Sequence, residues 1–369
     1  MSRKFNVCSI GEPSDPKTWS GTPFNLLTEF NKSGVIGSAF ASNNTTGLQR
    51  LYLKIASKLT YGNSIDMHRG RIYRELYANN VKRMTARSES NLTLHFGTLD
   101  FPFSSCPNGQ KHFLYCDSTW NLWSKYVTNI SLYSKKLLKD TEELEKESYQ
   151  QITHFFPISN YVKENLISYY QVPEEKITVV GTGLGIINPF FGEKDYSNKK
   201  ILFTAKGRFE DKGGDLVIEA FKLAHKKDPE LQLTIVGQDE YTSKFDLPNV
   251  KTYGFIPVED LQELFNTHSL FIMPAVNEPW GLVYIEALLC KMPIIGLNRN
   301  SLPEITDQEK YGFLLDESNP EHLARHFVDL FSNPKKLKEI GLGGQKFVSD
   351  KYTWENTAKK IVKTINKIS

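Results

Sequence analysis

Two groups of charged residues in the second half of the chain have the types and spacing needed to bind a phosphorylated ligand. The first is Gly207-Arg208 followed by Lys212-Gly213, where two cations four residues apart stand among glycines. Glycine lets the backbone approach an anion, and arginine offers a fixed fork of donors to phosphate oxygens. The run therefore suits a diphosphate, although a solvated surface loop would show the same residue types.

The second group is the pair Glu278 and Glu286, with Gly281 between them. We expect a helix to begin near Gly281, and a helix start offers unpaired N–H groups and a positive dipole end to a phosphate. If the whole segment were helical, the rise between the glutamates would be about 12 Å, wider than the roughly 5–9.5 Å of a glycosidase pair. This suits a long ligand with a sugar at one end of a diphosphate and a ribose at the other. Glu286 could instead face solvent, but its apolar neighbours predict a largely buried helix.

An alternation of strands and helices must position these residues. In the second half we expect strands at 200–205, 231–236, 250–253, 269–273 and 293–297, and helices at 214–226, 258–266 and 282–290. The first half is less regular, with strands expected at 5–10, 92–96, 112–116, 153–158 and 177–181, and helices at 24–30, 125–150 and 160–170. This alternation predicts an α/β protein with parallel doubly wound sheets, whose ligands bind beyond the carboxyl ends of the strands.

Length and composition limit the class of protein. The 369 residues favour about two domains, and a net charge of +3 gives no support for a nucleic-acid partner. The four cysteines, at positions 8, 106, 116 and 290, include no C-x-x-C pair, so neither a zinc site nor a dithiol motif is indicated. Scattered cysteines predict a reduced, cytoplasmic protein. No window approaches the roughly 18 apolar residues of a membrane span, so we expect any membrane contact at the inner face to be peripheral.

The glutamate pair and its surroundings resemble the retaining GT-B glycosyltransferases of glycosyltransferase family 4, the glycosyl transferases group 1. Glu278 and Glu286, with seven residues between them, resemble the family's E-x7-E motif. The run from Gly207 to Gly213 resembles its donor-diphosphate motif, and Gly237 ends a strand that is also typical of the family. The order and spacing of these motifs cover about 195–355.

The resemblance implies the GT-B fold, in which two Rossmann-like domains face a central cleft. The expected domains are an acceptor-side domain at 1–190, a donor-binding domain at 191–352, and a terminal helix at 353–369 that crosses back to the first domain. It also implies transfer of a hexose, with retention of anomeric configuration, from a UDP- or GDP-linked sugar to a glycan, lipid or small-molecule acceptor.

The resemblance further assigns roles to individual residues. Arg208, Lys212 and the helix start near Gly281 would stabilise charge on the departing diphosphate. Glu278 is expected at the sugar hydroxyls and Glu286 at the ribose hydroxyls. No cofactor or essential metal is implied, which agrees with the lack of a D-x-D triplet. The complete set of expected donor-binding residues is Gly21, Thr22, Gly207, Arg208, Lys212, Gly237, Phe255, Ile256, Glu278, Pro279, Trp280, Gly281, Leu282 and Glu286.

The chain departs from the family pattern on the acceptor side. Many members carry a histidine after a strand of the first domain, near the reacting sugar, whereas Asp117 stands at what resembles that position. Asp117 therefore joins Glu278, Arg208 and Lys212 as an expected catalytic residue, with contact to donor sugar or acceptor. His95 and His112 are alternatives, and each of these residues could instead be an ordinary polar residue at a strand end.

Residues 48–90 are unusually basic, with nine Lys or Arg against three Asp or Glu, a local charge of nine minus three, or +6. Apolar residues interleave with the cations. One interpretation is a surface for anionic lipid headgroups or an anionic acceptor. The other, which the pattern favours, is a set of amphipathic helices with a solvated basic face.

Two rival functions are weaker. Gly181 to Gly185 follows a predicted strand, but its G-x-G-x-G spacing and the lack of a following helix disfavour a dinucleotide site. A degenerate carbohydrate-binding or scaffold protein of the same fold would not need Arg208, Lys212 and both glutamates.

Overall fold

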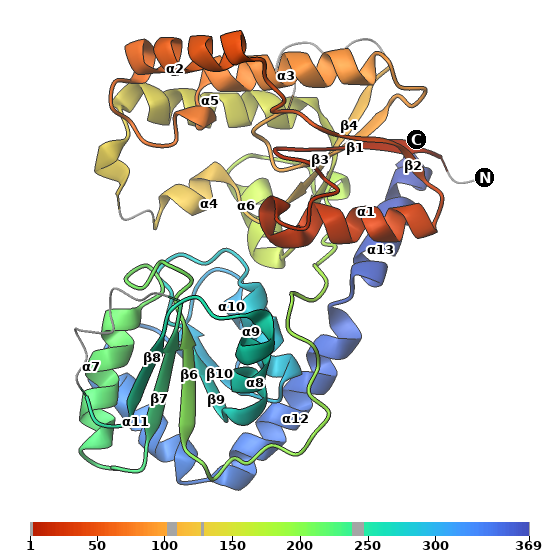
Figure 1. Cartoon of the computed structure of the whole chain (residues 1–369). Coiled ribbons are helices and arrows are strands. Elements are labelled where there is room, and N and C mark those ends of the chain that lie inside the picture. Colours follow the sequence, from red (N-terminus) through yellow and green to blue (C-terminus); the bar gives the residue numbers. More distant parts are fainter. Residues whose placement is uncertain (1–2, 102–108, 127–128, 238–246, 369) are drawn as a thin grey trace. The chain divides into compact units, whose positions relative to one another are not determined.

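The computed structural model describes residues 3–101, 109–126, 129–237 and 247–368, and Cys106 lies outside them. The chain forms two units (Figure 1). Unit 1 comprises Met1–Gly183 together with Thr353–Ser369, and unit 2 comprises Leu184–Tyr352.

Unit 1 contains a five-stranded sheet in the order β2-β1-β3-β4-β5, and each adjacent pair is parallel. Its strands are β1 (Phe5–Ser9), β2 (Ile36–Ala41), β3 (Leu92–Phe96), β4 (Lys111–Cys116) and β5 (Ile152–Pro157). Every residue of β1 and β3 is buried, as expected for central strands covered on both faces.

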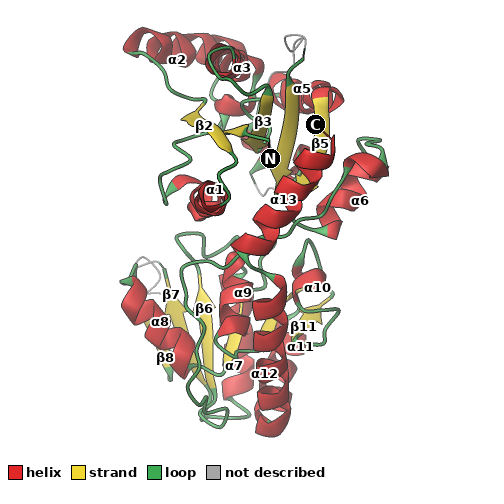
Figure 2. Cartoon of the chain, turned by 90° about the vertical axis from the view of Figure 1, so that its right-hand side faces the viewer, coloured by secondary structure: helices red, strands yellow, loops and turns green. Residues whose placement is uncertain are grey.

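Helices surround this sheet. They are α1 (Thr22–Lys32), α2 (Gly47–Tyr61), α3 (Arg71–Thr85), α4 (Trp120–Ser124), α5 (Lys135–Gln151), α6 (Asn160–Ser168) and α13 (Trp354–Ile368). Helix α13 packs along α1 (Figure 2). Within unit 1, Thr357 Oγ1 of α13 also donates a hydrogen bond of 3.3 Å to the carbonyl of Val180.

Unit 2 contains a six-stranded sheet in the order β11-β10-β9-β6-β7-β8, again with parallel pairs. Its strands are β6 (Lys200–Thr204), β7 (Gln232–Val236), β8 (Val250–Tyr253), β9 (Leu270–Ile272), β10 (Ile294–Leu297) and β11 (Gly312–Leu315). Its helices are α7 (Gly214–His225), α8 (Val258–Thr267), α9 (Leu282–Leu289), α10 (Leu302–Ile305), α11 (Pro320–Phe331) and α12 (Pro334–Lys351).

The structure confirms the α/β class with two parallel sheets and corrects two predicted elements. Residues 177–181 form no named strand. They run along β5 with an isolated bridge from Ile177 to Phe155, and the N–H groups of Thr178 and Val180 donate to the carbonyls of Phe155 and Pro157, each at 3.0 Å. The charged helix expected at 125–150 begins at Lys135, because Ser134 caps it there. Within the described residues, no helix has the length and apolarity that crossing a bilayer would require.

The boundary between the units lies earlier than residue 190. Residues 184–190 belong to unit 2 because their backbone is bound to it. The N–H of Ile186 donates to Glu286 at 2.7 Å, and the N–H of Phe190 donates to the carbonyl of Leu289 at 3.2 Å.

Candidate active site

The carboxyl ends of β6 and β7 carry the glycine-rich part of the candidate site. The N–H of Ala205 donates to the carbonyl of Val236 at 2.7 Å, and the N–H of Gly207 donates to the carbonyl of Gly237 at 2.9 Å. Gly237 has a φ of 117°, and a Cβ there would overlap the backbone nitrogen of Lys206. Glycine at this position therefore lets the two strand ends approach each other.

The two predicted cations lie on the loop between β6 and α7, in different environments. The Arg208 side chain is about half exposed at 52%, and its Nε lies 3.1 Å from Oδ2 of Asp211. Lys212 is buried, and its ammonium forms an ion pair with Glu278. The N–H of Val276 donates to the carbonyl of Asp211 at 3.0 Å. A backbone hydrogen bond therefore joins the loop after β6 to the loop after β9. Lys212 and Glu278, one from each loop, compensate each other's charge in an ion pair.

Helix α9 begins directly beside this ion pair. Gly281 is its N-cap with a φ of 78°, and a Cβ there would lie 2.6 Å from Cδ2 of Tyr284 and 3.0 Å from Cγ of Glu278. The Tyr284 hydroxyl donates to the carbonyl of Met273 at 2.6 Å, which ties α9 to the end of β9. The first turn of α9, starting at Leu282, therefore lies next to the carboxylate of Glu278.

Glu286 is a buried residue of α9, as its apolar neighbours predicted, with 7% of its surface exposed. Its Oε1 accepts the N–H of Ile186 at 2.7 Å and that of Ile187 at 3.3 Å. Burial raises the pKa of this carboxyl, while the two N–H groups and the charge of Lys206 oppose the rise. No residue in the described part of the chain hydrogen-bonds Oε2, so that oxygen is the one suited to a ligand hydroxyl.

The remaining expected donor residues of unit 2 divide by exposure. Phe255 is 73% exposed and lies near the glycine loop, since a Cβ at Gly207 would be 3.6 Å from its Cζ. Ile256, Pro279 and Leu282 are partly exposed. The ring of Trp280 is buried and packs edge-on against Tyr352 at 5.4 Å. The indole of Trp280 is therefore part of the core, and only its backbone remains suited to ligand contact.

In unit 1, two groups of predicted residues meet at the carboxyl edge of the sheet. Gly21, with a φ of 81°, precedes the first residue of α1, Thr22. Trp19, just before them, packs edge-on against Tyr115 of β4 with ring centroids 5.9 Å apart. Asp117 directly follows β4, two residues after Tyr115. Burial is the largest cause of the raised pKa of Tyr115, and the charge of Asp117 is the next. The start of α1 and Asp117 thus share one edge of unit 1.

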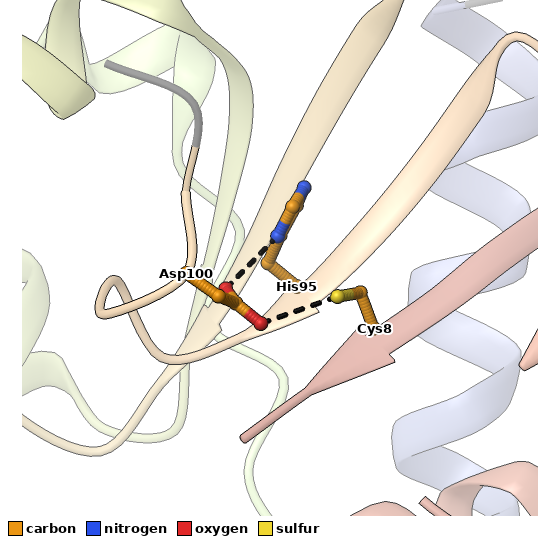
Figure 3. Close-up of side chains that lie close together, drawn as sticks. All are labelled: Cys8, His95 and Asp100. Atoms are coloured by element: carbon orange, nitrogen blue, oxygen red, sulfur yellow. Dashed lines mark hydrogen bonds and ion pairs between the residues drawn. The ribbon is translucent and has the colours of Figure 1, made fainter. Parts of the chain in front are cut away.

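The two histidine alternatives lie in the core of unit 1, and the prediction that either faces a sugar is wrong. His95 and His112 are 0% and 2% exposed. Asp100 lies between Cys8 and His95 (Figure 3), 3.2 Å from Cys8 Sγ and 3.2 Å from His95 Nδ1. His95 Nε2 lies 2.9 Å from Nδ1 of His112. Burial and the neighbouring His95 lower the pKa of His112 to about 3, so His112 is neutral.

Three metal-binding atom types meet in this cluster, since ligand atoms of Cys8, His95 and Asp100 lie within 4.8 Å of one another. Hydrogen bonds already account for their approach, with the thiol and the imidazole each bound to a different oxygen of Asp100. The cluster ties the segment after β3 to β1 and β3, which is a structural role.

Sequence reasoning missed a buried glutamate that holds the loop after Asp117. Glu145 of α5 accepts the N–H of Trp120 at 2.7 Å and the hydroxyls of Thr98 and Tyr170. Four further carboxylates occur on α5, and no local pattern separates Glu145 from them. Only the tertiary fold shows that it is buried.

Comparison with known proteins finds glycosyltransferases similar to this chain. Residues 188–364 match the family model of the glycosyl transferases group 1. The chain is 29% identical over 222 residues to a probable sucrose-phosphate synthase of Thermosipho melanesiensis, covering 56% of this chain and 51% of the relative. The chain spans about half the length of the curated relatives it matches.

Solved structures match over nearly the whole chain. A sucrose-phosphate synthase from Thermosynechococcus elongatus superposes with a TM-score of 0.71 at 16% identity, covering 99% of both chains. HepE of Anabaena, determined in complex with UDP-glucose, gives a TM-score of 0.67 at 14% identity, covering 98% of this chain and 99% of HepE. The chain therefore has the GT-B fold, and residues 188–364 match the family model of the glycosyl transferases group 1.

Proposed function

We propose that this protein is a retaining glycosyltransferase that moves a hexose from a UDP- or GDP-linked sugar to an acceptor. The observation that carries the proposal is the ion pair of Lys212 with Glu278 beside the first turn of α9. It brings a cation suited to a diphosphate, a carboxylate suited to sugar hydroxyls, and a helix start to one edge of the unit 2 sheet. The family match and the UDP-glucose bound by HepE support this assignment.

Departure of the nucleoside diphosphate builds negative charge on its oxygens. Arg208 is exposed enough to reach a phosphate, Lys212 is held in place by its ion pair, and the N–H groups at the start of α9 add a fixed dipole. We propose that these groups stabilise the leaving diphosphate without a cofactor or an essential metal ion. When the donor binds, Glu278 would keep its ion pair with Lys212 and also accept hydrogen bonds from the sugar hydroxyls.

The rest of the donor would lie on either side of the diphosphate. The exposed ring of Phe255, with Ile256 beside it, offers a face for the base, and Oε2 of Glu286 is suited to the ribose hydroxyls. Gly207 and Gly237 admit the close backbone approach that the phosphates need.

The residues that we propose for contact with the acceptor lie in unit 1. Asp117, with Gly21 and Thr22 on the same edge of unit 1, stays our proposal for contact with the reacting groups, and the acceptor would be a glycan, a lipid or a small molecule. The described cysteines Cys8, Cys116 and Cys290 are buried free thiols, which suits the cytoplasmic location that we propose.

A thermal-shift screen with a panel of UDP- and GDP-hexoses tests the donor. A ligand at about one hundred times its Kd stabilises the folded state by roughly 2.7 kcal/mol. We expect one nucleotide family to raise the Tm, both with and without EDTA. No shift with any nucleotide sugar at millimolar concentration would contradict the proposal.

A further inference from the structure

Helix α2 presents a row of large apolar side chains to solvent. They are Leu48 (82% exposed), Leu51 (54%), Tyr52 (60%), Ile55 (52%) and Leu59 (83%). At about 100° per residue these positions share one face of the helix. If residues 48–90 formed amphipathic helices with a solvated basic face, their apolar side chains would be buried. On α2, however, the apolar side chains of this row are exposed.

The opposite side of α2 packs against the rest of unit 1, so the exposed row is not needed to hold the helix in place. Leu53, Ser57 and Tyr61 are buried there. The Tyr61 hydroxyl donates to Asp140 of α5 at 2.8 Å and accepts the N–H of Arg71 of α3 at 2.9 Å. Figures 1 and 2 show α2 on the outside of unit 1. The apolar row therefore points outward from a fixed helix.

Helix α2 also carries exposed cationic side chains. Arg50, Lys54 and Lys58 are exposed on α2, which contains no acidic residue. None of the three pairs with a carboxylate of any residue that the structure describes. The neighbouring α5 differs, since its Lys136, Lys139 and Lys146 each pair with an acidic residue of the same helix. On a helical wheel Lys58 and Lys54 follow one margin of the apolar row, and the exposed Arg50 lies farther round the helix, next to Ser57.

We propose that α2 binds the surface of an anionic lipid bilayer, lying in the plane of the interface. Its apolar row would enter the boundary between headgroups and acyl chains, and Arg50, Lys54 and Lys58 would meet lipid phosphates. An interfacial helix has this combination of apolar face and basic margin, and each cation near an anionic surface strengthens binding. The proposal uses none of the residues of the candidate donor site and does not depend on the transferase activity.

Charge distinguishes the bilayer from a second copy of the chain. A symmetric pairing of two α2 helices would bring six cations together with no acidic residue on either helix to oppose them. An anionic bilayer offers both an apolar interior and compensating charge.

The test is co-sedimentation of the full-length protein with vesicles of phosphatidylcholine alone or with phosphatidylglycerol added. We expect binding to the anionic vesicles that weakens as salt rises. The charge variant Arg50→Gln/Lys54→Gln/Lys58→Gln should bind about one hundredfold more weakly. The apolar variant Leu51→Gln/Ile55→Gln/Leu59→Gln should lose binding by at least about tenfold.

Matched controls change the same residue types elsewhere. Leu132→Gln/Leu342→Gln removes exposed leucines, and Lys335→Gln/Lys336→Gln/Lys338→Gln removes three exposed lysines of α12. Both controls should bind as the wild type does, and all proteins should keep the wild-type Tm. The proposal is overturned by no binding at low salt, by equal binding to neutral vesicles, or by unchanged binding of either α2 variant. It is also overturned if the wild type is a dimer that the apolar variant converts to a monomer.

Discussion

At the scale of single residues, the ion pair of Lys212 with Glu278 gives the candidate site its most specific test. The pair joins residues 66 positions apart. Because Lys212 would bind the diphosphate and Glu278 the sugar, replacing them should have different consequences. Lys212→Met should weaken binding of both the free nucleoside diphosphate and the nucleotide sugar, by about 1.5–3 kcal/mol.

Glu278→Gln should separate the two ligands. It frees Lys212 from its carboxylate, so affinity for the free nucleoside diphosphate should stay the same or rise. Affinity for the nucleotide sugar, or its turnover, should fall. Isothermal titration of both ligands against both variants checks this, with Glu219→Gln on the surface of α7 as the control. Equal weakening of the two ligands by Glu278→Gln would show that Glu278 does not contact the sugar.

Glu286 predicts a pH dependence. Burial raises its pKa above the ordinary value of 4.5, so the folded protein holds this proton more tightly than the unfolded chain. The free energy of unfolding therefore contains a contribution that is lost as pH rises from 4.5 through the folded pKa. Glu286→Gln keeps an oxygen to accept the N–H groups of Ile186 and Ile187 but cannot ionise.

The Tm of Glu286→Gln minus the Tm of the wild type should therefore increase as the pH is raised from 4.5 to 7.5. Thermal unfolding across that range measures it. A difference in Tm that does not change with pH would mean that Glu286 titrates normally in the folded state.

At the scale of elements, the loop between β6 and α7 depends on a close approach to the end of β9. Gly213 has a φ of 80°, and a Cβ there would overlap the carbonyl of Pro274. Gly213→Ala should destabilise the protein by about 1–3 kcal/mol and weaken nucleotide binding, because Lys212 is the preceding residue. Differential scanning fluorimetry and titration measure the two effects.

Gly34→Ala is the matched control, since Gly34 also has a positive φ, 64°, but nothing lies within 4 Å of a Cβ built there. It shares the backbone strain without the overlap. If Gly213→Ala behaves no differently from Gly34→Ala, the close packing of this loop on β9 is not needed for the site.

In unit 2, periodicity predicted the strands β6 to β10 and the helices α7, α8 and α9 to within one residue at either end. Most of these strands are short apolar runs followed by a loop with glycine or charge. Periodicity failed where tertiary contacts override local pattern. Residues 177–181 donate two backbone hydrogen bonds to β5, but the carbonyl of Val180 accepts from Thr357 of α13, so they do not form a regular strand. β11 and the helices α10, α11 and α12 were not predicted.

The candidate site was predictable in part for the same reason. Residue type and spacing indicated Lys212, Glu278 and the burial of Glu286. They could not indicate that Glu286 accepts from Ile186, which is 100 residues distant in sequence. Nor could they show that His95 and His112 lie in the core, since a histidine in a strand has the same local pattern whether or not it reaches a ligand.

At the scale of the whole molecule, two parallel sheets and a terminal helix that returns to unit 1 form a GT-B fold. The predicted donor residues after β6, β7 and β9 lie at the carboxyl edge of the unit 2 sheet, and Asp117, with Gly21 and Thr22, lies at that of the unit 1 sheet. We propose that this chain breaks the bond between a hexose and a nucleoside diphosphate, using Arg208 and Lys212.

Release of UDP or GDP from its nucleotide sugar, measured with purified wild type and with Arg208→Gln/Lys212→Gln, tests that claim most directly. We expect the wild type to release nucleotide slowly with water as acceptor and faster when an acceptor is supplied. In the double variant the rate should fall at least about tenfold while the Tm without ligand changes little. The account is contradicted if the double variant, folded as the wild type is, releases nucleotide at the wild-type rate.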